Sequence, residues 1–597
     1  MQNTEDDFYA NNTDETINLT VTFKDLNTEE QNCFKKYIKD NKLVVKKILS
    51  WPRNNKSQLY YGLHLQNPDF DKFRSASGGD FKKEYKKLKE GDYPDLDTYT
   101  NKTDAEESLQ KLENSNPDQC SLKQDEGQFF GFKEVGIGNL GRFTQFVYIP
   151  AVYDASEETL EGRGTIFTQI MDLVIRRVLS EKKEFQELET KTKTKYNKIL
   201  QDESDSLVNL ETDLSSILSI YVPNASVNLK WKEEESIKIP TPQAEMKLIE
   251  DDYSSSVERC GHGLQRAFIM TMLQYLSSVQ STQSENEDKK LSSLPNVIIG
   301  IEEPEIYQHP NRQRHLSKIL LKLAEDGIKG VVEDMQMIYT THSPLFVDLD
   351  RFENIRKLYK TEEDSKRPKV TKISLTNFNE IVAKVEKAEN VKSGTYKPEA
   401  FKARIKAIMT PWMNEGFFAD VIVLVEGIND LAAITGTAAE LGYDLESIGI
   451  SVIPCMSKNN LHQPASIFSN LEIPIYGVWD SDYGKYKDKT AEKRNEINKN
   501  HRLLRLFNNN VEDWPNLVTE NFACFKNNLN YTLRSEIGTT VYDKVINDCC
   551  DNLCMAKKDA EKRSQVIETL IKEAREKSQK SETVEKIVHN IIKMADK

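Results

Sequence analysis

The sequence predicts an α/β protein with two parallel-sheet domains, a long helical insertion in the first domain and a set of helices after the second. Short apolar runs that end in acidic or histidine residues occur in two separate regions, 295–344 and 417–482. Such runs are typical of buried parallel strands, whose carboxyl ends form the ligand-binding edge of an open sheet. Upstream, 156–221 is almost wholly helix-forming, with apolar residues three and four positions apart.

Composition narrows the class of protein. The chain has 597 residues, more than a single hydrophobic core accommodates, so we expect two or three domains. It has no apolar run long enough to cross a bilayer and no signal-peptide pattern at Met1, which predicts a cytoplasmic protein. Among eight scattered cysteines only Cys549, Cys550 and Cys554 cluster, without a matching histidine pair, so we expect reduced thiols and no zinc site. The net charge of −14 argues against a general polyanion-binding protein, and any nucleic-acid surface must be local.

The first 155 residues are expected to form a β-rich part of the first domain. Strands are expected at 17–23, 43–64 and 146–154, the last leaving the β-subdomain, and the charge-dense stretch 81–112 is expected to be a solvated helical insertion.

A phosphate-binding loop of the form GxxxxGK followed by Ser or Thr does not occur in this chain. The nearest string, GIGNLGRF, has Gly136 and Gly141 at the right spacing, but Arg142 and Phe143 stand where Lys and a hydroxyl residue are needed. It also precedes a predicted strand, so we interpret it as a turn. Two explanations stay open: a truncated or misplaced start, or a natural variant with a crippled nucleotide site.

Two apolar strands, near 297–301 and 337–340, deliver polar side chains to their ends. Glu302 and Glu303 follow the first strand, and His342 follows the second. Nucleotide hydrolysis needs a carboxylate for the Mg²⁺ that bridges the phosphates and a base or orienter for the attacking water. We therefore expect Glu302 to serve the metal, Glu303 the water and His342 the γ-phosphate.

Upstream of these strands, Gly261 and Gly263 precede an apolar helix that begins near Leu264. A Gly-x-Gly turn at a helix start can present backbone N–H groups to an anion, so both glycines are candidate nucleotide-binding residues. In order, these elements resemble the signature loop, Walker B motif and histidine switch of ABC-type ATPases of the RecF and SMC branch. The string EEPEIYQHP at 302–310 resembles the EPE-x-x-x-HP form of the OLD (overcoming lysogenisation defect) nucleases, with Glu302 where Asp is usual. The resemblance implies an ABC or RecF-like ATPase domain whose helical arm pairs subunits.

The second region carries four candidate metal ligands. Strands are expected at 421–425, 448–453 and 473–478. Glu426 ends the first strand and Asp430 lies four residues on, at a strand-to-helix junction, so the two carboxylates can face one ion. Asp480 and Asp482 end the third strand, and strand alternation places residues two apart on the same side.

The pattern strand-Glu-Gly, followed by strand-Asp-x-Asp, resembles the Toprim fold of topoisomerases, DnaG-type primases and OLD nucleases. It implies phosphodiester chemistry assisted by Mg²⁺ or Mn²⁺. A primase-like zinc module and a topoisomerase tyrosine context are both missing from the sequence, which favours the OLD type. OLD-type sites often carry further acids in a segment resembling FE-x-x-LE, where this chain has Lys526 and Asn530. Lys558 resembles a basic position that neutralises a phosphate.

The leading hypothesis is an ATPase-controlled, Mg²⁺-dependent DNA endonuclease of OLD type in a prokaryotic antiviral system, as in the related Gabija and retron effectors. The alternatives are a nucleotide-sensing DNA-binding clamp or scaffold without nuclease activity and a RecF-like repair ATPase. Expected ligands and partners are Mg²⁺ or Mn²⁺, ATP, DNA, further copies of the chain as a homodimer or larger homo-oligomer, and a defence-system protein or RNA. The expected domains are 1–155 and 222–375 (ATPase), 156–221 (helical arm), 376–415 (helical linker), 416–530 (Toprim) and 531–597 (C-terminal helices).

Overall fold

The chain divides into two compact units, Met1–Thr341 and His342–Lys597, and each is described by itself. The computed structural model describes residues 4–51, 58–125, 140, 143–151, 183–202, 204–221, 226–229, 247–256, 259–261, 264, 267–268, 271, 296–326, 334–408, 411–486 and 489–595. Within these ranges no helix is long and apolar enough to cross a membrane.

An antiparallel sheet in the order β1-β3-β4-β5, with β2 against β3, forms the first part of the first unit. Its strands are β1 (Ile17–Lys24), β2 (Ile38–Lys39), β3 (Lys42–Leu49), β4 (Gln58–Gln66) and β5 (Ser121–Asp125), and α1 (Thr28–Cys33) precedes β2. The strands predicted at 17–23 and 43–64 are confirmed.

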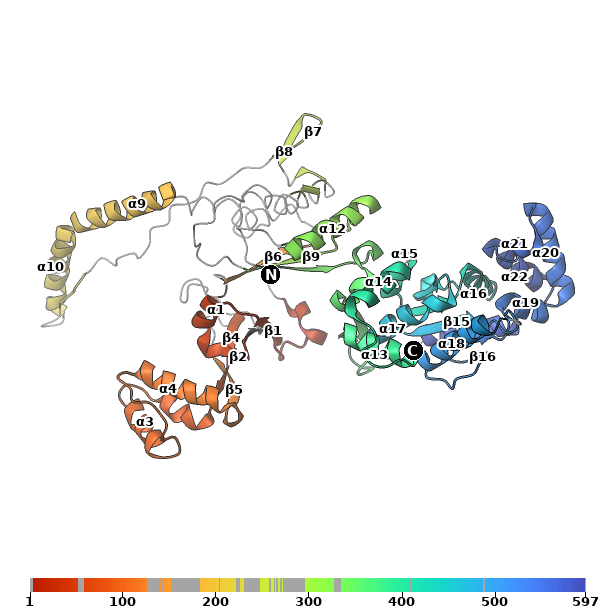
Figure 1. Cartoon of the computed structure of the whole chain (residues 1–597). Helices are drawn as coiled ribbons and strands as arrows, with labels where there is room; N and C mark the ends of the chain where they lie inside the picture. Colours follow the sequence, from red (N-terminus) through yellow and green to blue (C-terminus); the bar gives the residue numbers. More distant parts are fainter. Residues whose placement is uncertain are drawn as a thin grey trace. The chain divides into compact units, whose positions relative to one another are not determined.

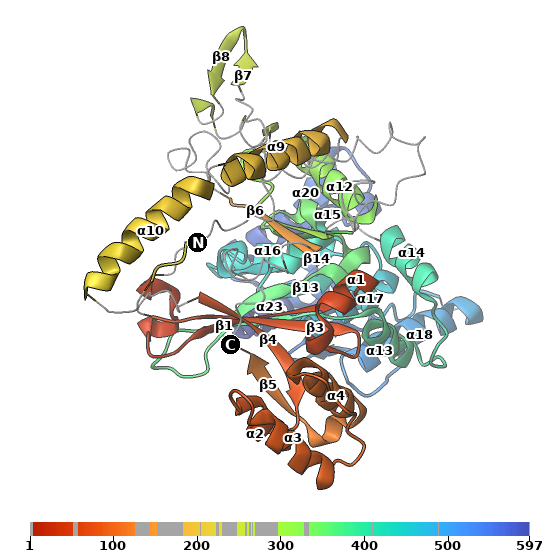
Figure 2. The same ribbon diagram turned by 90° about the vertical axis from the view of Figure 1, so that its left-hand side faces the viewer.

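Three helices are inserted between β4 and β5 (Figure 2). They are α2 (Asp71–Ser75), α3 (Phe81–Glu90) and α4 (Lys102–Ser115). The helical insertion predicted at 81–112 is confirmed, but it is more than a solvated face. It has its own core, in which Phe70, Phe73, Tyr85 and Leu109 are buried.

A three-stranded parallel sheet in the order β10-β9-β6 forms the second part of the first unit. Its strands are β6 (Thr144–Ile149), β9 (Asn296–Glu302) and β10 (Met335–Thr340), and α12 (Pro310–Asp326) connects β9 towards β10. The strand expected to leave the β-subdomain is therefore β6, which pairs with β9 along its length. Strands β7 (Lys247–Glu250) and β8 (Tyr253–Ser256) form a separate hairpin.

Helices α9 (Lys183–Asp202) and α10 (Ser204–Tyr221) follow each other in the yellow part of the chain (Figure 1). They confirm the helical prediction for 183–202 and 204–221, and the earlier part of the expected arm lies outside the described residues. Several apolar side chains of α10 are exposed, among them Leu210, Leu214 and Ile217.

The second unit is built on a five-stranded sheet in the order β14-β13-β15-β17-β16, in which only β16 runs antiparallel to its neighbour. The strands are β13 (Val421–Val425), β14 (Ile450–Pro454), β15 (Ile475–Asp480), β16 (Leu517–Val518) and β17 (Phe522–Phe525). The strands expected at 421–425, 448–453 and 473–478 are thus confirmed within two residues.

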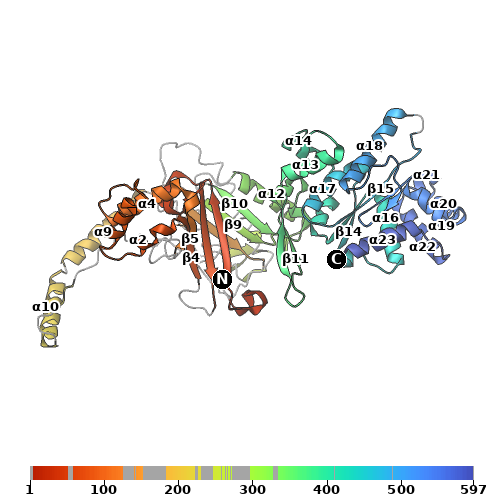
Figure 3. The same ribbon diagram turned by 90° about the horizontal axis from the view of Figure 1, so that it is seen from below.

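Helices cover both faces of this sheet (Figure 3). Alternation along β13 explains why, because Val421, Val423 and Val425 belong to one hydrophobic core and Ile422 and Leu424 to the other. The first face carries α16 (Ile428–Glu440), α19 (Leu529–Ile537), α20 (Thr539–Leu553), α22 (Ser564–Glu576) and α23 (Glu582–Ala595). A short helix, α21 (Lys557–Ala560), lies between α20 and α22 in the chain. The second face carries α13 (Phe378–Glu389), α14 (Pro398–Ile408), α17 (His462–Asn470) and α18 (Thr490–Leu506), with α15 (Pro411–Glu415) leading into β13.

The segment expected as a helical linker, 376–415, belongs to the core of the second unit. Ile381 and Val385 of α13 and Phe401 and Ile405 of α14 are buried against the sheet. The hairpin of β11 (Lys357–Thr361) and β12 (Val370–Ser374), which matches the two strands expected between 352 and 375, also lies in this unit. The apolar faces of α13 and α14 therefore stabilise the second unit directly.

Candidate functional site

The carboxyl ends of β13, β14, β15 and β17 meet at one edge of the second sheet, because these strands are parallel. Glu426 follows β13, Asp480 ends β15, and a 3₁₀ turn beginning at Lys458 follows β14. This edge is where an open α/β sheet binds its ligands. Glu426 and Asp480, two of the acids predicted from the sequence, therefore lie at the same sheet edge.

Glu426 and Asp480 lie side by side at this edge. Oε2 of Glu426 accepts a hydrogen bond from the backbone N–H of Asp480 at 3.3 Å, and Oδ1 of Asp480 accepts one from Leu529 N–H, at the start of α19, at 2.9 Å. Burial raises the pKa of both carboxyl groups, and the charges of Asp430, Glu426 and Asp482 raise that of Asp480 further. The edge thus concentrates negative charge in a partly dry environment.

Asp430 has a structural role in addition to its place near the site. Oδ2 of Asp430 accepts a hydrogen bond from Gly427 N–H at 2.8 Å, which caps the first turn of α16. Burial, followed by the charge of Glu426, raises the pKa of Asp430 above the usual range for an aspartate. The carboxylate of Asp430 is therefore close enough to Glu426 for the two negative charges to repel each other.

Asp482 is placed differently from what strand alternation predicted. The strand ends at Asp480, and Asp482 lies in the following turn with a φ of +62°. Its carboxylate is held by two lysines, with Oδ2 at 3.0 Å from Lys458 Nζ and Oδ1 at 2.8 Å from Lys485 Nζ. Side chains alternate between the two faces of a sheet only within a strand, so the prediction for Asp482 fails because the strand ends at Asp480.

Lys458 is the main residue of this edge to which the sequence assigned no role. Its side chain is almost wholly buried, and Nζ contacts the backbone oxygen of Asp480 at 2.6 Å and Oε2 of Glu496 at 3.0 Å. The sequence feature that could have indicated a role for Lys458 is its position in the turn that follows the buried strand β14. Glu496, on α18, gave no signal, because its contact with Lys458 depends on how that helix packs.

Carboxylate oxygens are the donors that Mg²⁺ and Mn²⁺ prefer, so the chemistry of the donor set fits a divalent cation. However, no group of three or more Asp, Glu, His or Cys side chains is drawn together tightly enough to hold a metal within the described ranges. Asp482 is engaged by two lysines, whereas Glu426, Asp430 and Asp480 each accept a backbone N–H bond. Glu426 and Asp480 also lie at the ends of neighbouring strands and are therefore the donors best placed to begin a metal site.

The positions downstream of β17 lack the second set of acids. Lys526 lies with Nζ 5.0 Å from the ring centre of Tyr483, and Asn530 donates to the backbone oxygen of Glu561 at 3.0 Å. Asn429, beside Asp430, donates to the same oxygen at 2.8 Å. These two bonds anchor the turn after α21, the short helix that carries the exposed Lys558, to the starts of α16 and α19.

In the first unit, β9 and β10 end side by side, with Glu302 opposite Thr340. Glu302 accepts hydrogen bonds from Tyr148 Oη at 2.5 Å and from Ala151 N–H at 3.1 Å. Burial and the bond to Glu302 raise the pKa of Tyr148 to about 12, so the phenol remains a donor at neutral pH. Both partners orient this carboxylate.

Glu303 adopts a φ of +40°, a region that non-glycine residues rarely occupy, and its N–H donates to Thr340 O at 2.9 Å. Such backbone conformations are often retained at functional sites. His342 follows β10 by two residues and opens the second unit.

Gly261 lies in the described part of the chain, shortly after β8. Gly263 and most of the 136–142 string fall outside it.

Two protein families match the chain. Residues 2–347, more than half of it, match the AAA ATPase domain family, and residues 417–482 match the overcoming lysogenization defect protein-like Toprim domain. The chain is 25% identical over 254 residues to the OLD nuclease of Thermus scotoductus, covering 42% of this chain and 41% of that protein. It is 23% identical over 349 residues to the Old nuclease of Escherichia phage P2, covering 57% and 54%.

The chain therefore spans about half the length of the curated relatives that it matches. A solved structure, the C-terminal region of the Burkholderia pseudomallei OLD protein, aligns at 18% identity with 30% of this chain and 99% of its own. The TM-score of that alignment is 0.22.

Proposed function

We propose that the chain, which belongs to the AAA ATPase domain family through residues 2–347 and matches the OLD-like Toprim domain at residues 417–482, is an OLD-type, metal-dependent DNA endonuclease controlled by its ATPase domain. The observation that carries this proposal is the convergence of Glu426 and Asp480 at the carboxyl edge of the second sheet, within the electrostatic range of Asp430 and Asp482. Structural acids are usually paired with cations. Here burial and mutual repulsion raise the pKa values of three of them, which is typical of a functional site.

Glu426 and Asp480 would hold a Mg²⁺ or Mn²⁺ ion, with Asp430 adjacent on α16. A divalent ion bound there supplies charge neutralisation at the scissile phosphate and a more acidic bound water. The chain's own residues do the rest. Lys458 holds Asp480 and Asp482 in place, and Lys558, on the anchored α21 segment, offers a cation to the DNA backbone.

The first unit would bind ATP and Mg²⁺ through the ends of β9 and β10. Glu302, oriented by Tyr148, would serve the metal, and Glu303 would position the attacking water. A contact of His342 with the γ-phosphate stays a prediction from the sequence, since this residue opens the second unit. Gly261 and Gly263 would contribute backbone N–H groups, as in the RecF-like ATPases. An antiviral role in a prokaryotic host is part of the same proposal, and it rests on the relationship to the OLD nucleases.

A second candidate function is DNA binding without cleavage, as a nucleotide-sensing clamp. One observation favours it: Asp482 is neutralised by Lys458 and Lys485, and the positions of Lys526 and Asn530 offer no further acids. A RecF-like repair ATPase is a variant of the same idea.

The decisive experiment is plasmid cleavage in Mg²⁺ or Mn²⁺ by the full chain and by Asp480→Asn and Glu426→Gln variants. Asparagine keeps the Oδ1 acceptor for Leu529 N–H and removes one repelling charge, so folding should be preserved. We expect cleavage to fall at least about 100-fold in both variants. The matched control is Asp551→Asn, an exposed carboxylate in the same unit.

Thermal unfolding provides a second readout. The metal ion should raise the melting temperature of the unaltered chain and of Asp551→Asn, but not that of Asp480→Asn. Undiminished cleavage by both site variants would contradict the nuclease site. Metal-dependent stabilisation and DNA binding by a chain that never cuts would support the clamp instead.

A further inference from the structure

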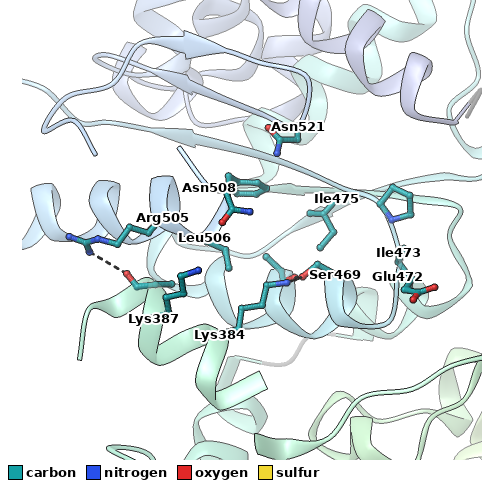
Figure 4. A pocket seen from close by; sticks show the side chains of 14 residues that line it. Lys384, Lys387, Ser469, Glu472, Ile473, Ile475, Arg505, Leu506, Asn508 and Asn521 are labelled. Carbon is teal, nitrogen blue, oxygen red and sulfur yellow. Dashed lines mark hydrogen bonds between the residues drawn. The ribbon is translucent and has the colours of Figure 1, made fainter. Parts of the chain in front are cut away.

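A pocket of about 450 Å³ opens on the second unit at the sheet edge opposite the carboxylates (Figure 4). It is lined by Ile475, the first residue of β15, and by Asn521, directly before β17. Asp480 is the last residue of β15, and a strand rises about 3.3 Å per residue, so the pocket lies about 16 Å from the carboxylate edge. It is therefore separate from the proposed cleavage site, and its volume is that of a small-molecule site.

Three cationic side chains line one side of the pocket. Lys384 and Lys387 come from α13, and Arg505 from the end of α18. Lys384 Nζ donates to Ser469 Oγ at 2.5 Å and to Asn470 Oδ1 at 3.1 Å, and Arg505 Nη1 donates to Ala388 O at 3.3 Å. These bonds hold Lys384 and Arg505 in place, whereas Lys387 is exposed.

The only acid among the lining residues is Glu472. Its carboxylate accepts a hydrogen bond from Tyr359 Oη and points away from the three cations (Figure 4). With three cations and one acid, the lining residues carry a net charge of +2. Glu472 does not contact the three cations, so their charges face the pocket. A ligand with two or more negative charges matches this surplus.

The remaining walls are apolar and amide-bearing. Phe507 is fixed in position, because its ring stacks on Trp479 at 6.0 Å and packs so closely on Gly477 that a Cβ there would lie 2.5 Å from it. Leu506 continues this apolar wall, and Asn508 and Asn521 add amide groups at the top of the pocket (Figure 4). Asparagine amides can pair with the N6 and N7 positions of adenine.

We propose that this pocket binds an adenine nucleotide, with its phosphates against Lys387 and Arg505 and its base against Phe507 and the two asparagines. Only a ligand that joins an anionic group to a flat apolar ring with polar edges uses all three kinds of wall. This site is additional to the nucleotide site proposed for the first unit.

Hydrogen–deuterium exchange of the full chain with ADP tests the proposal, because the exchange is read separately for each segment. ADP should slow amide exchange at the carboxyl ends of α13 and α18. In a Lys387→Gln/Arg505→Gln variant, the ADP concentration needed for this protection should rise at least about tenfold. The matched control is Lys392→Gln/Arg494→Gln, which removes the same two charges from exposed positions outside the pocket.

Cleavage activity without nucleotide and the circular dichroism spectrum should be the same in both double variants, since neither lies at the carboxylate edge. Equal protection in the pocket variant and the control would overturn the proposal. Protection confined to the first unit, or none at millimolar ADP, would overturn it as well. Pyrophosphate that protects α13 and α18 as strongly as ADP would show an anion site that does not recognise a nucleotide, and would also overturn it.

Discussion

The ammonium group of Lys458 lies 3.0 Å from Oδ2 of Asp482 in the interior of the second unit, with both side chains almost fully buried. A second lysine, Lys485, contacts the other oxygen of the same carboxylate at 2.8 Å, but about half of its side chain is exposed. Asp482 is therefore bound by one buried lysine and one half-exposed lysine. Because both lysines carry the same charge, replacing each in turn shows how much burial adds to the strength of such an ion pair.

Replacing Lys458 with Met should destabilise the second unit strongly, by about 3–5 kcal/mol, because it removes the buried cation shared by Asp482 and Glu496. Asp482 then keeps only the half-exposed Lys485, and Glu496 keeps only Lys499. Lys485→Met should cost at most about 1 kcal/mol, since that pair is screened by solvent. Urea unfolding of the two variants measures the difference. Similar free energies of unfolding would show that the buried network does not hold this edge together.

The contact between His462 and Glu389 predicts loss of stability in mild acid. Nε2 of His462 lies 3.0 Å from Oε1 of Glu389. Burial lowers the pKa of His462 to about 4. Burial alone would raise the pKa of Glu389, but the close contact with His462 and the hydrogen bond from Tyr396 outweigh it and lower the pKa to about 2.

The lowered pKa values of His462 and Glu389 both reduce the free energy of unfolding as the pH falls. Below about pH 6.5 the unfolded chain protonates His462 while the folded chain does not, and below about pH 4.3 the same holds for Glu389. The free energy of unfolding should therefore fall as the pH decreases from 7 to 4, by up to about 3 kcal/mol from His462. In His462→Gln this slope should be reduced, and in His589→Gln, an exposed histidine of the same unit, it should not. A flat profile from pH 7 to 5 in the unaltered chain would rule this out.

The exposed apolar side chains of α10 predict self-association. Leu210, Leu214 and Ile217 are each more than a third exposed, and a symmetric homodimer is the commonest way to cover such a face. Light scattering at micromolar concentration should show a dimer. A Leu210→Glu/Leu214→Glu variant should raise the dissociation constant at least about tenfold, whereas Asn209→Glu/Ser216→Glu, with the same added charge, should not. A monomer at all concentrations would contradict the proposal.

ATP hydrolysis by the 597-residue chain should be slow. Glu302 and Glu303 are proposed to serve a metal and a water, but the sequence has no GxxxxGK loop to fix the β- and γ-phosphates. Positioning provides most of the catalysis in phosphoryl transfer. ATP turnover measured on the chain and on Glu303→Gln tests this prediction. Brisk hydrolysis that is lost in Glu303→Gln would show that other residues hold the phosphates, and the 136–142 string would be the first place to look.

Much of the fold could be predicted because its signals are local. The apolar run 421–425 matches β13 residue for residue, and the acids at strand ends fall where parallel strands expose them. The role of the helices after β12 could not be predicted from their polar composition, since the few apolar residues that bury α13 and α14 are recognisable only beside the sheet they cover.

The strands of the second unit, the position of Glu426 and Asp480 at one sheet edge and the similarity to the OLD nucleases all follow from the order of residues along the chain. Which charged side chains meet at that edge follows from how the elements pack. Lys458 reaches Asp482 across 24 positions and Glu496 across 38, and the chain turns at Asp482 with a left-handed backbone, where the carboxylate contacts Lys458 and Lys485. Periodicity along the chain specifies which face a residue occupies, whereas a contact between distant side chains depends on how separate elements pack.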